Sequence, residues 1–118
     1  EITIFGDGTQ TRDFTFVDDA VKANILAAKG NMVGEVFNVG GGSRISVNEL
    51  FNEIEKIVGK KAKIKYIEKQ KGDVRDTLAD VSKAKKVLGW KPNTEINKGL
   101  VRFTKWMLQL SSEHALGQ

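Results

Sequence analysis

An arginine close to a glycine-containing turn is the first group in the sequence that could do chemistry. Arg12 follows Gly6-Asp7-Gly8, whose two glycines allow a tight bend that a ligand can approach. A guanidinium carries five N–H donors in a planar fork that matches the oxygens of a phosphate or a carboxylate. The pattern therefore favours an anion-binding role for Arg12. A structural ion pair with Asp7 or Asp13 would use the same residue types and remains the alternative.

A second polar cluster lies in an irregular stretch further along the chain. It consists of Gln70, Lys71, Gly72, Asp73, Val74, Arg75 and Asp76. Its glycine lets the backbone approach a ligand, Asp73 can accept hydrogen bonds from a pair of sugar hydroxyls, and Lys71 or Arg75 can neutralise a phosphate. An ordinary charged surface loop has the same composition, so both interpretations stay open.

Three consecutive glycines resemble a phosphate-binding loop between a strand and a helix. Gly40-Gly41-Gly42-Ser43 nevertheless has Ile45 where a dinucleotide fingerprint needs a third glycine, and it lacks the Gly-Lys-Ser/Thr of a P-loop. The pattern favours a tight strand-to-helix turn. A weak anion contact at the N-terminus of the following helix remains possible.

Residues able to break bonds are scarce. The sequence has no cysteine, and its one histidine, His114, lies in a polar tail, so we predict no metal site. The single tyrosine, Tyr66, has Gln70 rather than lysine four residues later, so it lacks the partner of a catalytic base, and we interpret it as strand packing. We therefore expect no catalytic residue in this chain.

Composition and charge limit the classes of protein. The 118 residues suffice for one domain, and no apolar run approaches the ~20 residues of a membrane span. The start at Glu1 shows no signal peptide and no initiator methionine, so we expect a fragment of a longer cytoplasmic protein. The net charge of +4 raises the possibility of nucleic-acid binding, but the lysines are scattered among acids and favour a solvated surface.

Hydrophobic periodicity predicts an α+β domain over residues 1–110, with short strands and about four helices, followed by a disordered tail over 111–118. The expected strands are Glu1–Phe5, a strand within Thr11–Val17, Glu35–Val39 and Lys63–Ile67. The expected helices are Ala20–Ala28 with Asp18 or Asp19 as N-cap, Ser46–Val58, a short one from Asp80 or Ser82 to Leu88, and one starting at Thr94.

Two of these helices carry specific signals. Ser46 and Glu49 have the spacing of a capping box, and Gly59 is placed to end the same helix. In the last helix, Gly99 lies on the apolar face, which suggests that another backbone comes close there, because a mid-helix glycine costs about 1 kcal/mol.

Several of these segments together resemble the C-terminal half of the extended short-chain dehydrogenase/reductase family, in particular its nucleotide-sugar epimerases and dehydratases. The matching segments are Ile4–Asp19, Val36–Gly42 with Ser46–Leu50, Gly72–Arg75, Ala79–Ala84 and Leu88–Pro92. The resemblance covers nearly the whole chain. Within the family, the sequence resembles the UDP-glucose 4-epimerases most.

The resemblance implies a division of labour. In this family the N-terminal half binds NAD on a Rossmann fold and carries the catalytic Tyr-x-x-x-Lys, while the C-terminal half grips the nucleotide diphosphate. Neither the glycine fingerprint nor the tyrosine pair is present here. The chain is therefore expected to be the substrate-binding part of a homodimeric, NAD-dependent UDP-glucose 4-epimerase, to bind no NAD itself and to be inactive alone.

The same resemblance assigns roles to individual residues. Arg12 corresponds to the arginine that clamps the diphosphate, the backbone of Phe5 to the group that meets the uracil edge, and Asp73 to the acid that holds the ribose. The family commonly has a second phosphate arginine where this chain has Gln70, and Lys69 or Lys71 could compensate as point charges.

Three other functions remain open. One is a related activity of the same family, such as a dehydratase, decarboxylase or reductase. Another is a basic module that binds nucleic acid, with an affinity that falls steeply with salt. The third is a structural module that dimerises through the helix Ser46–Val58, since exposed apolar surface can drive self-association.

Overall fold

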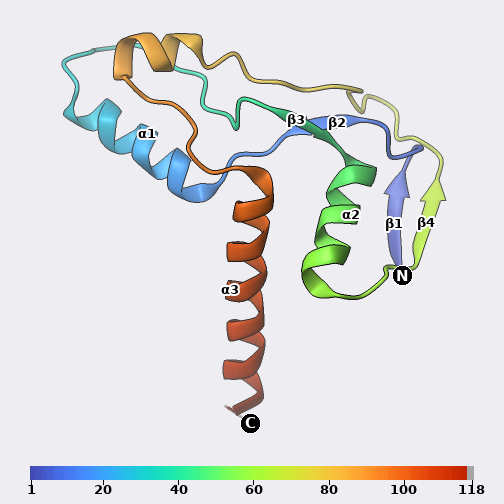
Figure 1. Ribbon diagram of the computed structural model, residues 1–118. Helices are drawn as coiled ribbons and strands as arrows, with labels where there is room; N and C mark the ends of the chain where they lie inside the picture. Colours follow the sequence, from blue (N-terminus) through green and yellow to red (C-terminus); the bar gives the residue numbers. More distant parts are fainter. Residues whose placement is uncertain (117–118) are drawn as a thin grey trace.

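The computed structural model describes residues 1–116 and confirms the α+β class, with short strands and four helices among them. The elements, shown in Figure 1, are β1 (Ile2–Phe5), β2 (Thr11–Asp13), α1 (Val17–Lys29), β3 (Arg44–Ser46), α2 (Val47–Val58), β4 (Ile64–Ile67), the short π-helix η1 (Ala84–Leu88) and α3 (Ile96–Leu116).

Two small sheets organise the part of the molecule that contains the polar clusters. β1 pairs in parallel with β4, with Ile2 opposite Ile64 and Phe5 opposite Ile67. β2 pairs antiparallel with β3, and a parallel bridge joins Thr11 to Asp76. Segments that are more than 60 residues apart in the sequence therefore meet at β2.

Helix α2 forms as its sequence signals predict. The Ser46 hydroxyl accepts a hydrogen bond from the Glu49 N–H, and the Glu49 side chain accepts from the Ser46 backbone N–H, which completes the capping box. Gly59 ends the helix with a φ of 71°, a left-handed conformation that glycine adopts without steric cost.

The most buried cluster lies between α1 and η1, at the opposite end of the molecule from β1 and β4 (Figure 1). It contains Ala23, Ala84 and Trp90. The Trp90 indole N–H donates to the Asp19 carbonyl at 2.9 Å, and the Thr94 N–H donates to the Asp19 carboxylate at 3.0 Å. These bonds fix the start of α1 against the segment that leads into α3.

The N-cap expected for α1 is wrong. The helix begins at Val17 with Phe16 at the cap position, so Asp18 and Asp19 both fall in its first turn. Neither carboxylate caps the helix. The Asp18 carboxylate accepts from the side chain of Arg102, and the Asp19 carboxylate accepts from the Thr94 N–H. Gly30 ends the helix in an extended conformation, and its N–H donates to the carbonyls of Leu26 and Ala27.

Two strand predictions also fail in part. The segment 35–39 is not a strand, because no other strand in the described part of the chain lies where it could pair; Phe37 and Val39 pack against the α1–η1 cluster instead. The strand expected around Arg12 ends at Asp13, since β3 opposes only Thr11–Asp13.

Helix α3 differs from expectation in two ways. It continues through Leu116, so residues 111–116 are helical rather than a disordered tail, and residues 117–118 lie outside the described residues. A Cβ built on Gly99 would lie 3.0 Å from the Phe16 ring, so the close neighbour is an aromatic side chain rather than a backbone.

Candidate functional site

Arg12 is held by its own strand and by the 68–76 loop. Its Nη1 donates to the carbonyl of Thr11 at 2.8 Å and to that of Arg75 at 3.1 Å, and its Nη2 donates to Asp73 Oδ1 at 2.6 Å. The side chains of Arg12 and Asp73 remain 26% and 31% exposed. Of the five guanidinium donors, the Nε–H and one Nη2–H are left for a ligand.

This arrangement answers the question of which acid pairs with Arg12. The pairing with Asp7 or Asp13 that we considered is wrong, because the partner is Asp73, 61 residues away in the sequence. Arg12 and Asp73, predicted from separate motifs, therefore meet at one place on the surface.

The loop that carries Asp73 is fastened to β2. Thr11 donates its N–H to the Arg75 carbonyl at 2.9 Å and its hydroxyl to Asp76 Oδ1 at 2.6 Å. The Thr77 N–H in turn donates to the Thr11 carbonyl at 3.2 Å. The hydroxyl of Thr11 is the main reason why the pKa of Asp76 lies below its ordinary value.

A tight turn presents Asp73 to the surface. The Asp73 N–H donates to the Gln70 carbonyl at 3.3 Å, and Gly72 has a φ of 85°, a conformation that side chains rarely adopt. The glycine is therefore needed for the turn itself. The polar stretch is irregular, as expected, but it has a defined shape.

A polar hollow of about 250 Å³ lies beside the Arg12–Asp73 pair. It is lined by Phe5, Gly6, Asp7, Thr9, Gln10, Lys69 and Arg75. Three predicted site residues, Phe5, Lys69 and Arg75, thus share one wall. The Arg75 carbonyl, which accepts from Arg12, connects the hollow to the ion pair.

Four residues of this hollow, Gly6, Asp7, Thr9 and Gln10, were not among the predicted site residues. Asp7 Oδ1 accepts from the Thr9 N–H at 3.0 Å and from the Thr9 hydroxyl at 2.6 Å, which lowers the pKa of Asp7. Gln10 donates its side-chain amide to the Phe5 carbonyl at 2.8 Å. An aspartate two residues before a threonine is a known turn signal, and it could have indicated this wall.

Phe5 lies where its backbone can face a ligand. The N–H groups of Ile2 and Gly6 both donate to carbonyls at β4. Because alternate residues of a strand point their backbone groups to opposite edges, those of Phe5 face away from β4. Its carbonyl already accepts from Gln10 and retains one lone pair.

Four predicted residues are absent from the lining of the hollow. Arg12 and Asp73 form the ion pair beside it, and Gln70 and Lys71 are exposed on the turn before Asp73. Tyr66, expected to pack within its strand, is half-exposed, and its hydroxyl donates to Asn48 Oδ1 at 3.1 Å.

The glycine turn at 40–42 does not join a strand to a helix as predicted, because it connects the irregular segment 35–39 to β3. The Gly41 N–H donates to Asp13 Oδ1 at 2.7 Å, and a Cβ at Gly41 would collide with the Phe14 carbonyl oxygen. The other Asp13 oxygen accepts from the Ala79 N–H at 3.1 Å. Asp13 therefore holds this turn and the segment at Ala79 against β2.

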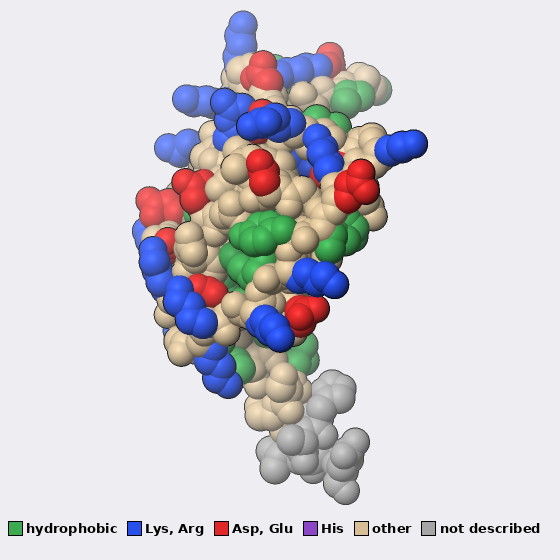
Figure 2. All heavy atoms as spheres, turned by 90° about the vertical axis from the view of Figure 1, so that its right-hand side faces the viewer, with side chains coloured by type: hydrophobic (Ala, Val, Ile, Leu, Met, Phe, Trp, Pro, Cys, Tyr) green, Lys and Arg blue, Asp and Glu red, His purple; other side chains and the backbone are tan. Residues whose placement is uncertain are grey.

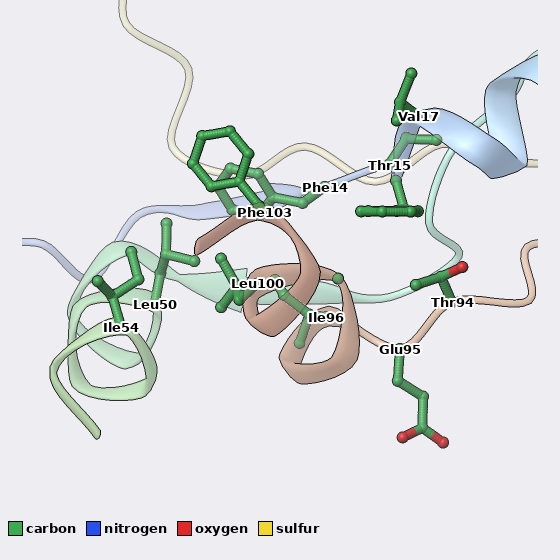
Figure 3. Close-up of a pocket in the computed structure, with 12 residues that line it drawn as sticks. Phe14, Thr15, Val17, Leu50, Ile54, Thr94, Glu95, Ile96, Leu100 and Phe103 are labelled. Carbon is green, nitrogen blue, oxygen red and sulfur yellow. The ribbon is translucent and has the colours of Figure 1, made fainter. Parts of the chain in front are cut away.

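An apolar groove of about 350 Å³ lies between α2, α3 and the segment before α1. Figure 3 shows Leu50 and Ile54 of α2 beside Ile96 and Leu100 of α3, while the Glu95 carboxylate turns away from them. With few polar groups to orient a nucleotide, this groove is a less suitable site than the polar hollow.

The surface shows no concentrated basic patch on the side that carries β1 and β4. Lysine and arginine side chains are spread over this face and interleaved with acidic ones (Figure 2). Within the described residues, no helix is long and apolar enough to cross a membrane, and no group of three histidine, cysteine or acidic side chains could hold a metal.

Comparison with known families decides where the chain belongs. The family described as GDP-mannose 4,6 dehydratase matches residues 1–103. The chain belongs to this family. The assignment confirms the resemblance to nucleotide-sugar epimerases and dehydratases seen in the sequence motifs.

Individual members of the family show how much of a complete protein is present. A UDP-glucuronate 4-epimerase from Thermodesulfobacterium geofontis is 47% identical over 106 residues, which are 89% of this chain and 32% of that protein. The chain therefore spans about a third of the length of the family members that it matches.

Solved structures of the family have the same fold in this region. The UDP-glucose 4-epimerase from Thermotoga maritima, solved with UDP-glucose, has a TM-score of 0.87 and 40% identity over 93% of this chain and 35% of its own. The UDP-glucuronic acid 4-epimerase from Bacillus cereus, solved with UDP-glucuronic acid and NAD, has a TM-score of 0.86 and 38% identity over 92% and 35%.

Proposed function

We propose that this chain is the UDP-sugar-binding part of an NAD-dependent, cytoplasmic UDP-sugar 4-epimerase. The observation that carries the proposal is the contact of Arg12 with Asp73 beside the polar hollow. The names of the similar 4-epimerases, solved with UDP-glucose or UDP-glucuronic acid, support this substrate class. The NAD site of such an enzyme would lie in the part of the complete protein that this chain does not span.

Each residue would have one task in binding. Arg12 would donate its remaining Nε–H and Nη2–H to the diphosphate, while its Nη1 stays bound to backbone carbonyls. Asp73 accepts from Arg12 through Oδ1, so Oδ2 would accept from a ribose hydroxyl. The backbone of Phe5 would face the uracil edge.

The ion pair also makes binding less costly in entropy. A free arginine side chain loses up to ~2 kcal/mol of rotamer entropy when a ligand immobilises it. Three hydrogen bonds within the protein already hold Arg12. Most of that ordering therefore occurs on folding rather than on binding.

Titration of the 118-residue chain with UDP-glucose and with UDP-glucuronic acid, at one stated salt concentration, tests this proposal. We expect Arg12→Ala to weaken both affinities by about tenfold or more, because a charge-assisted hydrogen bond contributes ~1.5–3 kcal/mol. Asp73→Asn should weaken binding less, since an amide oxygen still accepts from a hydroxyl.

Lys60→Gln is the matched control, since it removes one positive charge from a residue that does not line the hollow. Equal affinities for the unaltered chain and Arg12→Ala would remove Arg12 from the site. The ratio of the two affinities of the unaltered chain would show which sugar is preferred.

A further inference from the structure

The second phosphate-binding group needs a new assignment. The sequence resemblance places it at the position of Gln70, but Gln70 does not line the hollow. Its carbonyl accepts from the Asp73 N–H and so helps to form the turn that presents Asp73. The side chain of Gln70 is a neutral amide, so it cannot bind a phosphate through a positive charge as an arginine does.

Two positively charged residues, Lys69 and Arg75, line the hollow, and their backbones are held in different ways. Lys69 lies in an unpaired stretch after β4. Arg75 is fixed through its carbonyl, which accepts from the Thr11 N–H at 2.9 Å and from Arg12 Nη1 at 3.1 Å. The backbone of Arg75 is thereby attached to the same strand that holds Arg12.

The side chain of Arg75 is free to turn toward a ligand. It is 73% exposed, and its Nε lies 4.0 Å from Asp76 Oδ2, the outer limit of an ion pair. Asp76 directs its other oxygen to the Thr11 hydroxyl at 2.6 Å, which holds the carboxylate at the loop. The planar fork of Arg75 is therefore not bound in a bidentate pair with Asp76.

The charges around the hollow allow an anion to enter. Asp7 is the one acidic residue among its lining residues, and the Oδ1 of Asp7 is occupied by Thr9. Lys69 and Arg75 oppose that single negative charge, so positive charge is in excess among the lining residues. The charge of Arg12 beside the hollow is offset by its partner Asp73. The lining therefore favours an anionic ligand.

We propose that Arg75 takes the place of the arginine missing at Gln70 and binds the diphosphate together with Arg12. This inference rests on the proposed function and deepens it by naming the second phosphate-binding residue. We assign the role to Arg75 rather than to Lys71, because Arg75 lines the hollow and its carbonyl accepts a hydrogen bond from Arg12.

A comparison of ligands with and without phosphates tests the role of Arg75. Uridine, UMP and UDP are titrated into the unaltered 118-residue chain and into Arg75→Gln, Arg75→Lys, Lys71→Gln and the control Lys60→Gln. We expect Arg75→Gln to weaken UDP binding about tenfold and to change uridine binding less than about twofold. Arg75→Lys keeps the positive charge without the planar fork, so its affinity for UDP should lie between that of the unaltered chain and that of Arg75→Gln.

The outcomes separate this inference from the proposed function. Equal loss of uridine and UDP affinity in Arg75→Gln would indicate a change of structure and overturn the inference, as would a larger loss of UDP affinity in Lys71→Gln. If Arg12→Ala weakens UDP binding and Arg75→Gln does not, the inference fails while the proposed function stands. If the unaltered chain binds UDP no better than uridine, both fail.

Discussion

Asp13 is the side chain on which the geometry around Arg12 depends most. Arg12 and Asp13 are neighbours on β2, and the two Asp13 oxygens accept from the Gly41 and Ala79 N–H groups. These bonds join β2 to the glycine turn and to the segment after the Asp73 loop. An acid next to the proposed phosphate-binding residue thus serves the scaffold.

We expect Asp13→Ala to lower the free energy of unfolding by about 2–4 kcal/mol, because two partly buried amides lose their acceptors. Asp13→Asn should recover part of this loss, since its one side-chain oxygen can satisfy one amide. Urea unfolding followed by circular dichroism measures both. Asp18→Ala, which breaks an exposed pair with Arg102, is the control and should cost at most about 1 kcal/mol. Equal losses in Asp13→Ala and Asp18→Ala would contradict the scaffold role.

Residue types alone singled out Arg12 and Asp73 as candidate site residues, but they did not show that the two side chains would meet. Arg12 and Asp73 could be selected because their residue types suit phosphates and sugars, and the glycine nearby marked a turn. That Arg12 would pair with Asp73, and Thr11 with Asp76, could not be predicted, because these partners lie 61 and 65 residues apart. The wall formed by Thr9 and Gln10 rests on hydrogen bonds within residues 5–10, whereas Lys69 reaches the hollow through the pairing of β1 with β4.

At the scale of elements, local signals succeeded where the partner is also local. The capping box and the closing glycine of α2 involve residues three or four apart, so the sequence contains the whole interaction. A strand needs a second strand. The residues at 35–39 have strand character, but no strand in the described part of the chain lies beside them, and their side chains pack instead.

The capping box gives α2 a predictable response to acid. Hydrogen bonds from Ser46 hold the pKa of Glu49 below its ordinary value of 4.5. A lowered folded-state pKa contributes stability that is present above pH 4.5 and is lost as the pH falls through the lower, folded-state value.

Ser46→Ala should therefore cost about 1 kcal/mol at pH 7. It should also flatten the part of the stability–pH curve that lies below pH 4.5. Urea unfolding at pH 7, 5 and 3 measures both effects. Other carboxylates with a lowered pKa titrate in both the unaltered chain and Ser46→Ala, so the difference between the two stability curves reports Glu49. These other carboxylates are Asp7, Glu35, Glu55, Asp76 and Asp80. Parallel curves would show that Glu49 does not depend on Ser46.

At the scale of the molecule, the chain is open. Its accessible surface is 8844 Å², whereas a compact monomer of this mass exposes about 6,300 Å². Its radius of gyration is 17.5 Å, against about 13.5 Å for a compact domain of this length. Figure 1 shows why, since α3 extends away from the other elements with Phe103, Trp106 and Met107 half-exposed.

We expect this apolar face of α3 to drive self-association of the isolated chain. Sedimentation equilibrium should give an average mass that rises with protein concentration. Trp106→Lys should reduce the rise, because a charge on the face opposes its burial. Leu78→Lys, at another exposed apolar residue, is the control. A mass that does not depend on concentration would contradict the expectation.

One of the two tryptophans is buried and the other is exposed, so their intrinsic fluorescence can report on two parts of the chain separately. Trp90 is 2% exposed between α1 and η1, while Trp106 is 52% exposed on α3. Iodide in solution will quench the fluorescence of Trp106 and leave that of Trp90 until the α1–η1 cluster opens. One emission spectrum can thus follow the covering of α3 and the melting of the core as two separate events.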